Sequence, residues 1–420
     1  MMKIKQLPKD KGLDHTLDLL GEGYVFIGHR AYQYQTDLFQ TRLMGKKMIC
    51  MTGRDGARLF YNPDLFERKH VMPHRVKETL TGKNSIQGLD GAAHQNRKAL
   101  FINLTNEERE RELVKIATKI WEEAIKKWPN KGKVILMDEA KEILCKSACQ
   151  WIGIPLYEEQ VQGVAKALGE TVMGFGKIGM AHWKGRMARN RLEVWLKEMV
   201  TNIREGKMKV KHDTILYEMS YHRDETGKLL APQIVAVELL NLLRPIVAVA
   251  VYITFMVLAL YENPAYKVKL ALGNEEDRER FNEEVRRFYP FAPFVGAKVK
   301  KNFIWRGYPF KKGTIALLDL YGTNHDERLW NMPYMFNPDR YKKEKKNAYN
   351  FMPQGGGSLK GHRCVGESIT MAMMDSALEV FIHKISYEMP PQDLSYSLSE
   401  IPTLPTSGVI LSNIKRIKNK

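Results

Sequence analysis

The sequence predicts a single, mainly helical domain with small β-sheets at its margin. Most of the hydrophobic periodicity repeats at helical spacing, and the strand-like runs are short. No internal repeat and no Gly/Ser/Pro-rich linker divides the 420 residues. Length alone suggests two or three domains. Without a linker, however, we expect one domain that spans residues 1–420.

Four segments carry the helical periodicity. Thr105 and Glu108 have the spacing of a capping box, and Pro129 ends the apolar stripe that follows them. A helix with Pro232 in its first turn and Glu262 at its end would have 31 residues, roughly 46 Å at ~1.5 Å per residue. The predicted helices cover residues 108–128, 192–203, 232–262 and the stretch after Gly366.

The strand-like pieces are short; two lie near the start of the chain and two lie later, after residue 300. They are rich in β-branched and aromatic residues and are bounded by Gly, Pro or Asn. The predicted strands are Lys47–Thr52, Ala57–Tyr61, Phe303–Phe310 and Thr314–Leu320.

Composition excludes several classes of protein. Apolar residues make up 44% and charged residues 27% of the chain, which argues against disorder and collagen-like sequences. The 66 Lys and Arg residues outnumber the 48 Asp and Glu residues, for a net charge of +18. That excess allows an anionic partner such as nucleic acid, a membrane surface, an acidic protein or an acidic substrate.

Four cysteines are too few for a disulfide scaffold, and none forms a CxxC pair, so no zinc ribbon or thioredoxin-type site is indicated. We interpret Cys145 and Cys149, four residues apart on a predicted helix, as a packed apolar pair rather than a metal or redox pair. The polar N-terminus has no apolar signal region, so we expect a cytoplasmic protein.

The apolar run from Pro245 to Leu260 resembles a membrane span but has only 16 residues. About 20 are needed to cross a bilayer. Glu238, Asn241 and Arg244 precede it and would make a longer span costly. We therefore predict a buried helix and no transmembrane segment.

Arg244-Pro245 interrupts this helix. Proline removes a backbone N–H and clashes with the preceding turn, so a kink or opening is expected there. Arg244 cannot lose its charge, and burial without a partner is costly. Two interpretations remain open: a salt bridge to a distant acid, or a site that binds the carboxylate of a ligand.

A glycine-rich loop, Gln354–Glu367, places a single cysteine, Cys364, just before a predicted helix. Backbone N–H groups and the helix dipole stabilise a thiolate at such a place. Glycines allow close approach of a flat cofactor, and His362 and Arg363 suit its acidic edge. The alternatives are a phosphate loop, which lacks the expected GK[ST] motif, and an ordinary buried cysteine.

Upstream, Glu284 and Arg287 lie one helical turn apart, and Arg340 follows in Pro338-Asp339-Arg340-Tyr341. With the cysteine loop, these motifs make the chain resemble a cytochrome P450, a haem-thiolate protein. The resemblance covers nearly the whole chain and is closest to the bacterial fatty-acid peroxygenase branch. It implies the cytochrome P450 fold, a haem b cofactor, Cys364 as its metal ligand, and the Glu284–Arg287 pair locked by Arg340.

Departures from the wider superfamily indicate the branch. Gly357 and Lys360 stand where Phe and Gly are usual, within a Gln-Gly-Gly-Gly loop about one residue shorter than the branch form. Arg244-Pro245 replaces the acid–alcohol pair that delivers protons to bound dioxygen. The resemblance therefore implies hydrogen peroxide as oxidant, a redox partner that is not required, and long-chain fatty acids as substrates. The fatty-acid carboxylate on Arg244 would serve as acid and base.

By the same resemblance, Gln87 occupies a distal position that is His or Gln within the branch. The Gln form implies hydroxylation at the α- or β-carbon, and we expect mainly the β-carbon, while decarboxylation to a terminal alkene remains a side reaction. Candidate residues for the haem propionates are Arg68, His94, Lys98 and His362. Thr81 replaces a larger aromatic residue that some relatives place over the fatty acid.

Three alternatives remain open. The basic run Arg340, Lys342, Lys343, Lys345 and Lys346 could dock an acidic redox partner, which would make the protein a conventional monooxygenase. A haem-dependent fatty-acid sensor would bind both ligands and form no product. Nucleic-acid binding is suggested by nine basic against three acidic residues between Lys184 and Lys211, but no nucleic-acid-binding motif is present there, so we expect no such partner.

Overall fold

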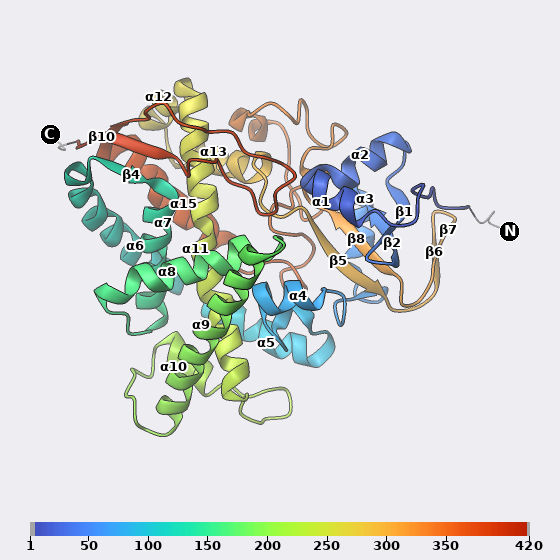
Figure 1. Cartoon of the computed structure of the whole chain (residues 1–420), viewed down its shortest axis with the longest axis horizontal. Helices are drawn as coiled ribbons and strands as arrows, with labels where there is room; N and C mark the ends of the chain where they lie inside the picture. The colour runs from blue at the N-terminus through green and yellow to red at the C-terminus, as the bar shows by residue number, and fades with distance from the viewer. Residues whose placement is uncertain (1–4, 418–420) are drawn as a thin grey trace.

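The computed structural model describes residues 5–417, and α-helices dominate them (Figure 1). The long helices gather on one side of the molecule, while the N-terminal strands and short helices form the other side (Figure 1). The prediction of a mainly helical fold with small sheets is confirmed. The first four residues, part of the polar N-terminus from which we expect no secretion signal, lie outside the described range.

Most helices are separated by short connections. The α-helices are α1 Thr16–Glu22, α2 Phe26–Gln33, α3 Gly53–Phe60, α4 His74–Val76, α5 Gly91–Leu104, α6 Glu107–Lys127, α7 Leu136–Ile152, α8 Glu158–Gly174, α9 Met180–Arg204, α10 Ile215–Ser220, α11 Pro232–Glu262, α12 Pro264–Leu272, α13 Glu275–Phe288, α14 Tyr321–Asn324 and α15 Glu367–Glu379. Short 3₁₀ segments include η3 (Ile86–Gly88) and η5 (Pro338–Lys342).

Three small sheets lie at the margin. A five-stranded sheet has the order β1-β2-β8-β5-β3, a three-stranded sheet the order β4-β10-β9, and β6-β7 is a hairpin. In the larger sheet β2 runs parallel to β8 and all other pairs are antiparallel. The strands are β1 Leu38–Leu43, β2 Lys46–Met51, β3 Phe66–Glu67, β4 Lys133–Ile135, β5 Phe294–Val299, β6 Phe303–Trp305, β7 Tyr308–Phe310, β8 Ile315–Asp319, β9 Ile385–Glu388 and β10 Ile410–Arg416.

The centre of the molecule is α11, which has the predicted 31 residues and crosses the helical side (Figure 1). It packs against α7, α9 and α15. In the described part of the chain, α11 alone is long and apolar enough to cross a membrane, but 89% of its most apolar window is buried in protein. The apolar run is therefore a core helix, as predicted. Cys145 and Cys149 on α7 are likewise buried, reduced and packed in this core.

Two local predictions are wrong. Residues 57–61, predicted as a strand, form the end of α3, because Gly53 at φ +75° starts a helix that buries Ala57 and Phe60 on one face. A short apolar run does not distinguish the two structures. The capping box predicted at Thr105 and Glu108 is also wrong. The N-cap of α6 is Asn106, whose side chain accepts from the N–H of Arg109, whereas the Thr105 hydroxyl donates back to the carbonyl of Phe101.

Candidate active site

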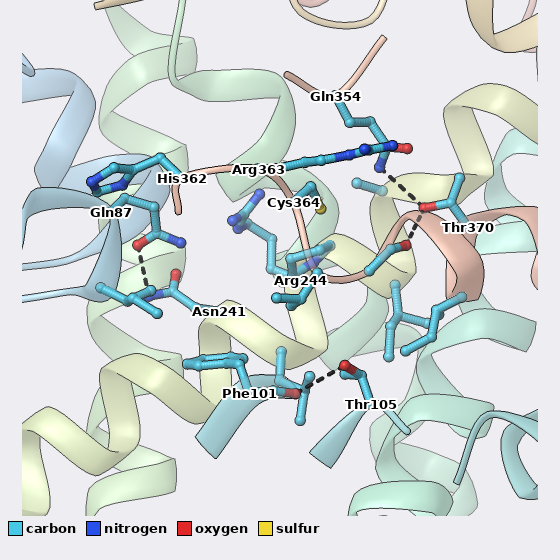
Figure 2. A pocket seen from close by; sticks show the side chains of 18 of the residues that line it. Gln87, Phe101, Thr105, Asn241, Arg244, Gln354, His362, Arg363, Cys364 and Thr370 are labelled. Atoms are coloured by element: carbon cyan, nitrogen blue, oxygen red, sulfur yellow. Dashed lines mark hydrogen bonds between the residues drawn. The ribbon is translucent and has the colours of Figure 1, made fainter. Parts of the chain in front are cut away.

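Residues predicted from distant parts of the sequence line one cavity under α11 (Figure 2). With its solvent-filled mouth, the cavity encloses about 1290 Å³ free of protein atoms. The lining residues that the sequence predicted are Gln87, His94, Lys98, Arg244, Pro245, His362 and Cys364. Arg68 is half-buried and is not among the residues that line the cavity.

Cys364 faces the cavity two residues before Gly366, the N-cap of α15 (Figure 2). Burial raises the pKa of its thiol, while the N–H of Gly366 and the charges of Lys98 and Arg286 oppose that rise. Lys98 Nζ also donates to the carbonyl oxygen of Arg363 at 2.5 Å, so its ammonium lies next to the cysteine. These groups favour a thiolate once a cation shares its charge.

The loop before Cys364 is held by side chains from three other elements. Gln354 Oε1 accepts from Arg286 Nη2 at 2.8 Å, and Gln354 Nε2 donates to Thr370 Oγ1 at 3.1 Å. The N–H of Gly356 donates to the Tyr61 hydroxyl at 2.8 Å. Gly357 has φ +80°, and a Cβ there would lie 2.7 Å from the Tyr61 ring, so only glycine fits.

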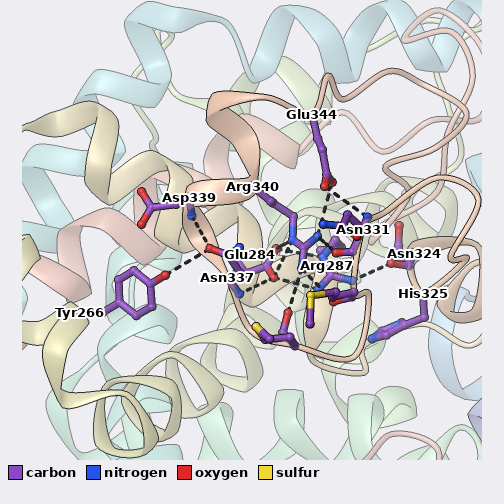
Figure 3. Close-up of polar contacts among 12 residues, drawn as sticks. Tyr266, Glu284, Arg287, Asn324, His325, Asn331, Asn337, Asp339, Arg340 and Glu344 are labelled. Atoms are coloured by element: carbon purple, nitrogen blue, oxygen red, sulfur yellow. Dashed lines mark hydrogen bonds and ion pairs between the residues drawn. The ribbon is translucent and has the colours of Figure 1, made fainter.

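Behind this loop lies a buried ion cluster centred on Glu284 (Figure 3). Its carboxylate accepts from Arg287 Nε and Nη2 at 2.9 and 2.8 Å and from Arg340 Nε at 3.1 Å. The N–H of Asn337 donates to the same carboxylate at 2.9 Å. The predicted pairing of Glu284 with Arg287, locked by Arg340, is confirmed. The cluster fixes α13 to η5 and thereby supports the segment that leads to the cysteine loop.

One edge of the cavity is lined by the basic side chains of His94, Lys98 and His362. The rings of His94 and His362 lie 4.1 Å apart between centroids, and His362 is 3.4 Å from a carboxylate oxygen of Asp90. Burial, with the charges of His362 and Lys98, lowers the pKa of His94 to about 4. Burial lowers the pKa of Lys98 to about 8. Desolvated basic groups with one carboxylate among them create a site for an anion.

Arg68 adds a further charge to this edge. Its guanidinium lies 4.2 Å from the centre of the Phe60 ring, and Nη1 donates to the carbonyl of Gly296 at 2.9 Å. Burial lowers its pKa to about 10, and its charge depresses the pKa of both His94 and His362. Arg68 therefore adds positive potential to this edge without lining the cavity.

Arg244 lines the cavity from α11, and protein atoms enclose most of its side chain, including Nε. Within residues 5–417, its Nε has no hydrogen-bond partner and no carboxylate lies within ion-pair distance. Burial, with the charge of Arg189, lowers its pKa to about 9. The first interpretation of Arg244, a salt bridge to a distant acidic residue, is therefore wrong. The assigned helix runs through Pro245 without interruption.

The sequence did not predict the buried polar network beside Arg244. Asn241 Nδ2 donates to Glu238 Oε2 at 3.0 Å, to the carbonyl of Thr81 at 2.9 Å and to Gln87 Oε1 at 3.4 Å (Figure 2). Glu238 Oε1 in turn accepts from Arg97 Nη1 at 2.7 Å. In the sequence, Glu238 and Asn241 are polar interruptions of an apolar helix. Their spacing of three residues, with Arg244 three further on, is the signal that places them on one face.

These residues fit the haem that the resemblance implies. Cys364 offers a thiolate at one face of the cavity, and the basic residues at its edge have too few acidic partners of their own. Most of the remaining lining is apolar, as a porphyrin ring requires; it includes Phe101, Leu242, Ile246, Ala248, Val249, Leu320, Val365 and Ile369. Arg244 reaches the same cavity from α11, whereas His94 and Lys98 reach it from α5.

Comparisons with known proteins agree with this site. The family model described as Cytochrome P450 matches residues 279–412. Curated relatives include cytochrome P450 4e5 of Drosophila mettleri, 25% identical over 111 residues, and cytochrome P450 4A7 of Oryctolagus cuniculus, 30% identical over 111 residues. Each alignment covers 26% of this chain, and the chain spans about a fifth of the length of these relatives (20% and 21%).

Solved structures match over nearly the whole chain. Cytochrome P450EX alpha (CYP152N1) with myristic acid is 41% identical and has a TM-score of 0.95; the match covers 98% of this chain and 100% of that one. Cytochrome P450SP alpha (CYP152B1) in complex with (R)-ibuprophen is 38% identical, with a TM-score of 0.93 and coverage of 96% and 99%. A variant of cytochrome P450 OleT in complex with arachidonic acid is 32% identical, with a TM-score of 0.96 and coverage of 99% and 100%.

Proposed function

The chain belongs to the cytochrome P450 family, on its CYP152 branch, and from this premise we propose that it oxidises long-chain fatty acids with hydrogen peroxide. One observation carries the proposal. Arg244 is largely enclosed by protein, has a buried Nε without a hydrogen-bond partner, lacks an acidic partner within residues 5–417, and lines the same cavity as Cys364. A buried cation of this kind requires an anion from outside the protein. A fatty-acid carboxylate supplies that anion, and its chain suits the apolar lining.

The cofactor is a haem held through the Cys364 thiolate, with Lys98, His94, His362 and Arg68 at the edge that receives its propionates. A thiolate-ligated haem supplies the cleavage of the peroxide O–O bond and the oxidation of a C–H bond. The protein contributes the position of the substrate. Because Arg244 is fixed within α11, the bound carboxylate and the first carbons of the chain stay near the cofactor.

Peroxide chemistry also needs a base that takes one proton and an acid that returns it to the departing water. Arg244 keeps its charge at neutral pH even with its pKa lowered to about 9, so it cannot serve as this base. The substrate carboxylate bound to it can accept and return the proton. The overall reaction consumes one fatty acid and one hydrogen peroxide and yields one hydroxy acid and one water. A redox partner is then not required.

Gln87 lies at the cavity wall and directs the choice of product. Its amide does not titrate in the physiological range, and Oε1 accepts from Asn241 Nδ2. Because this bond occupies Oε1, the Nε2–H group is the part of the Gln87 amide that remains available as a hydrogen-bond donor. A fixed neutral donor favours transfer of oxygen over loss of the carboxyl group, so we propose hydroxylation, mainly at the β-carbon. Four reduced cysteines suit the cytoplasmic location that we propose.

The proposal is tested by incubating the purified, haem-loaded protein with long-chain fatty acids and peroxide, without a reductase. Mass spectrometry then distinguishes 2-hydroxy acid, 3-hydroxy acid and terminal alkene. We expect 3-hydroxy acid to dominate and Arg244→Leu to lose turnover, while Arg244→Lys, which keeps the charge, retains a part. No oxidised product, or product only with a reductase present, would refute the proposal. Spectral binding of the fatty acid without product would indicate a sensor.

A further inference from the structure

Helix α9 carries a second apolar stripe that faces solvent. Its inner face packs into the core through Ala188, Leu192, Leu196, Met199, Val200 and Ile203. On the outside, Met180, Trp183, Met187 and Val194 are 72%, 57%, 58% and 54% exposed. An ordinary amphipathic helix has polar residues on its solvent side. An outward apolar stripe therefore indicates a partner.

The spacing places the four apolar residues on one side of α9, with Asn190 and Arg191 between Met187 and Val194. Trp183, Met187 and Val194 follow Met180 by three, seven and fourteen residues, so all four lie within one narrow sector of the helix. They extend over roughly 21 Å at ~1.5 Å per residue. Ile178, 61% exposed in the turn before α9, continues the stripe at its N-terminal end. In Figure 1, α9 lies on the near side of the molecule, far from α12.

Basic residues border the stripe on both sides. Lys184 and Arg191 lie on one flank and Lys197 on the other, and all three are exposed. None of the three has an acidic partner within ion-pair distance among residues 5–417, whereas the neighbouring Arg186 is paired with Glu78. The stripe ends before Glu198. The basic excess between Lys184 and Lys211 thus surrounds an apolar surface.

A groove between α8 and α9 extends this surface. With its open mouth it encloses about 980 Å³ free of protein atoms, and its lining includes Val164, Ala167, Leu192 and Trp195. The polar residues at the groove are Gln160, Lys166, Glu170 and Arg191. Arg191 thus lies between the stripe and the groove and borders both.

We propose that the outer face of α9 binds the surface of an anionic lipid bilayer. Methionine, valine and isoleucine side chains enter the acyl boundary, tryptophan suits the interface, and Lys184, Arg191 and Lys197 contact anionic head groups. Nucleic acid would use the positive charges but not the apolar stripe. A second copy of the chain would bring the same unpaired cations together, on a protein whose net charge is +18.

Sedimentation of the full-length holoprotein with vesicles tests this proposal. One set of vesicles contains phosphatidylcholine alone, and the other contains equimolar phosphatidylcholine and phosphatidylglycerol. We expect binding to the anionic vesicles that is weakened by salt, with a blue shift of tryptophan emission that disappears in Trp183→Phe. Binding to neither set of vesicles would overturn the proposal.

Two double variants separate the contributions. Trp183→Ser with Met187→Ser removes apolar contact and should lower the partition coefficient at least about tenfold. Lys184→Gln with Arg191→Gln should lower it about thirtyfold on anionic vesicles, since each cation near such a surface contributes ~1 kcal/mol. The Soret and far-UV spectra check that each variant retains haem and fold.

The matched control replaces two exposed apolar residues on another face, Val268→Ser with Leu272→Ser on α12, and should leave vesicle binding unchanged. Equal binding by all variants would overturn the proposal. So would a concentration-dependent dimer that is lost in Trp183→Ser with Met187→Ser while vesicles remain unbound, because the occupant would then be a second copy. Retention of duplex DNA in place of vesicles would assign the face to nucleic acid and equally contradict the lipid proposal.

Discussion

Burial of Arg244 without an acidic partner makes the substrate-free protein less stable than it would be with an apolar residue there. The fall in the pKa of Arg244 from 12.5 to about 9 corresponds to about 5 kcal/mol against its charged form. At pH 7, well below both values, the arginine is charged in the folded and unfolded states, so this penalty is constant with pH. Replacement by leucine removes the penalty and loses some packing.

We therefore expect Arg244→Leu to raise the free energy of unfolding of the substrate-free holoprotein by about 2–4 kcal/mol. Urea denaturation followed by far-UV circular dichroism measures this difference. Arg244→Lys, which keeps a buried charge, should show no such gain. Added fatty acid should stabilise the wild type through linkage and leave Arg244→Leu unchanged. A less stable Arg244→Leu protein, or equal stabilisation of both proteins by fatty acid, would refute the reasoning.

Four further predictions concern other groups. Glu284→Gln leaves two buried arginines without their shared carboxylate and should cost about 3–5 kcal/mol of unfolding free energy, with loss of haem on gel filtration; undiminished stability would contradict the ion cluster. Burial raises the pKa of Asp319 to about 7 in the folded state, above its ordinary 3.8. Between these values the folded state binds the extra proton, so the free energy of unfolding should fall as the pH rises from 4 to 7, by on the order of 3–4 kcal/mol. Asp319→Asn should abolish that slope in denaturation curves, and a slope that persists would exclude Asp319 as its source. Gln87→His introduces a titratable donor and should raise the fraction of terminal alkene in gas chromatography; an unchanged product ratio would remove Gln87 from product control. Asn241→Leu frees the Gln87 amide and should broaden hydroxylation over neighbouring carbons while fatty-acid affinity stays within about threefold, since the carboxylate site is separate; unaltered regiochemistry would argue against positioning by Asn241.

Predictions from the sequence were best for features that depend on the spacing of residues along a single helix. The bounds of α11 follow from Pro232 and from the end of the apolar run, and the Glu284–Arg287 pair follows from a separation of one turn. The strand predicted for residues 57–61 was wrong because a short apolar run suits either a strand or the buried face of a helix such as α3. Only the positive φ of Gly53 and the packing of the sheet decide between them.

The features of the candidate site also fall into those that the sequence predicts and those that only the folded structure creates. Cys364 and Arg244 carry chemistry that their sequence neighbours reveal, namely a glycine-rich loop before a helix and a charge at the start of an apolar run. The link between Asn241 and Gln87 joins residues 154 positions apart, so no local pattern contains it. The absence of an acid near Arg244, within residues 5–417, is a property of the assembled core alone. That absence turns an ordinary arginine into a candidate carboxylate site.

The central claim is that the substrate carboxylate, held by Arg244, completes the catalytic site. The most direct test compares peroxide-driven turnover of a long-chain fatty acid with that of its methyl ester on the same holoprotein, in the absence of any reductase. Both have the same chain, but only the acid offers a carboxylate that can pair with Arg244 and accept a proton. The account predicts hydroxylated product from the acid and none above background from the ester. Equal turnover of acid and ester would contradict it.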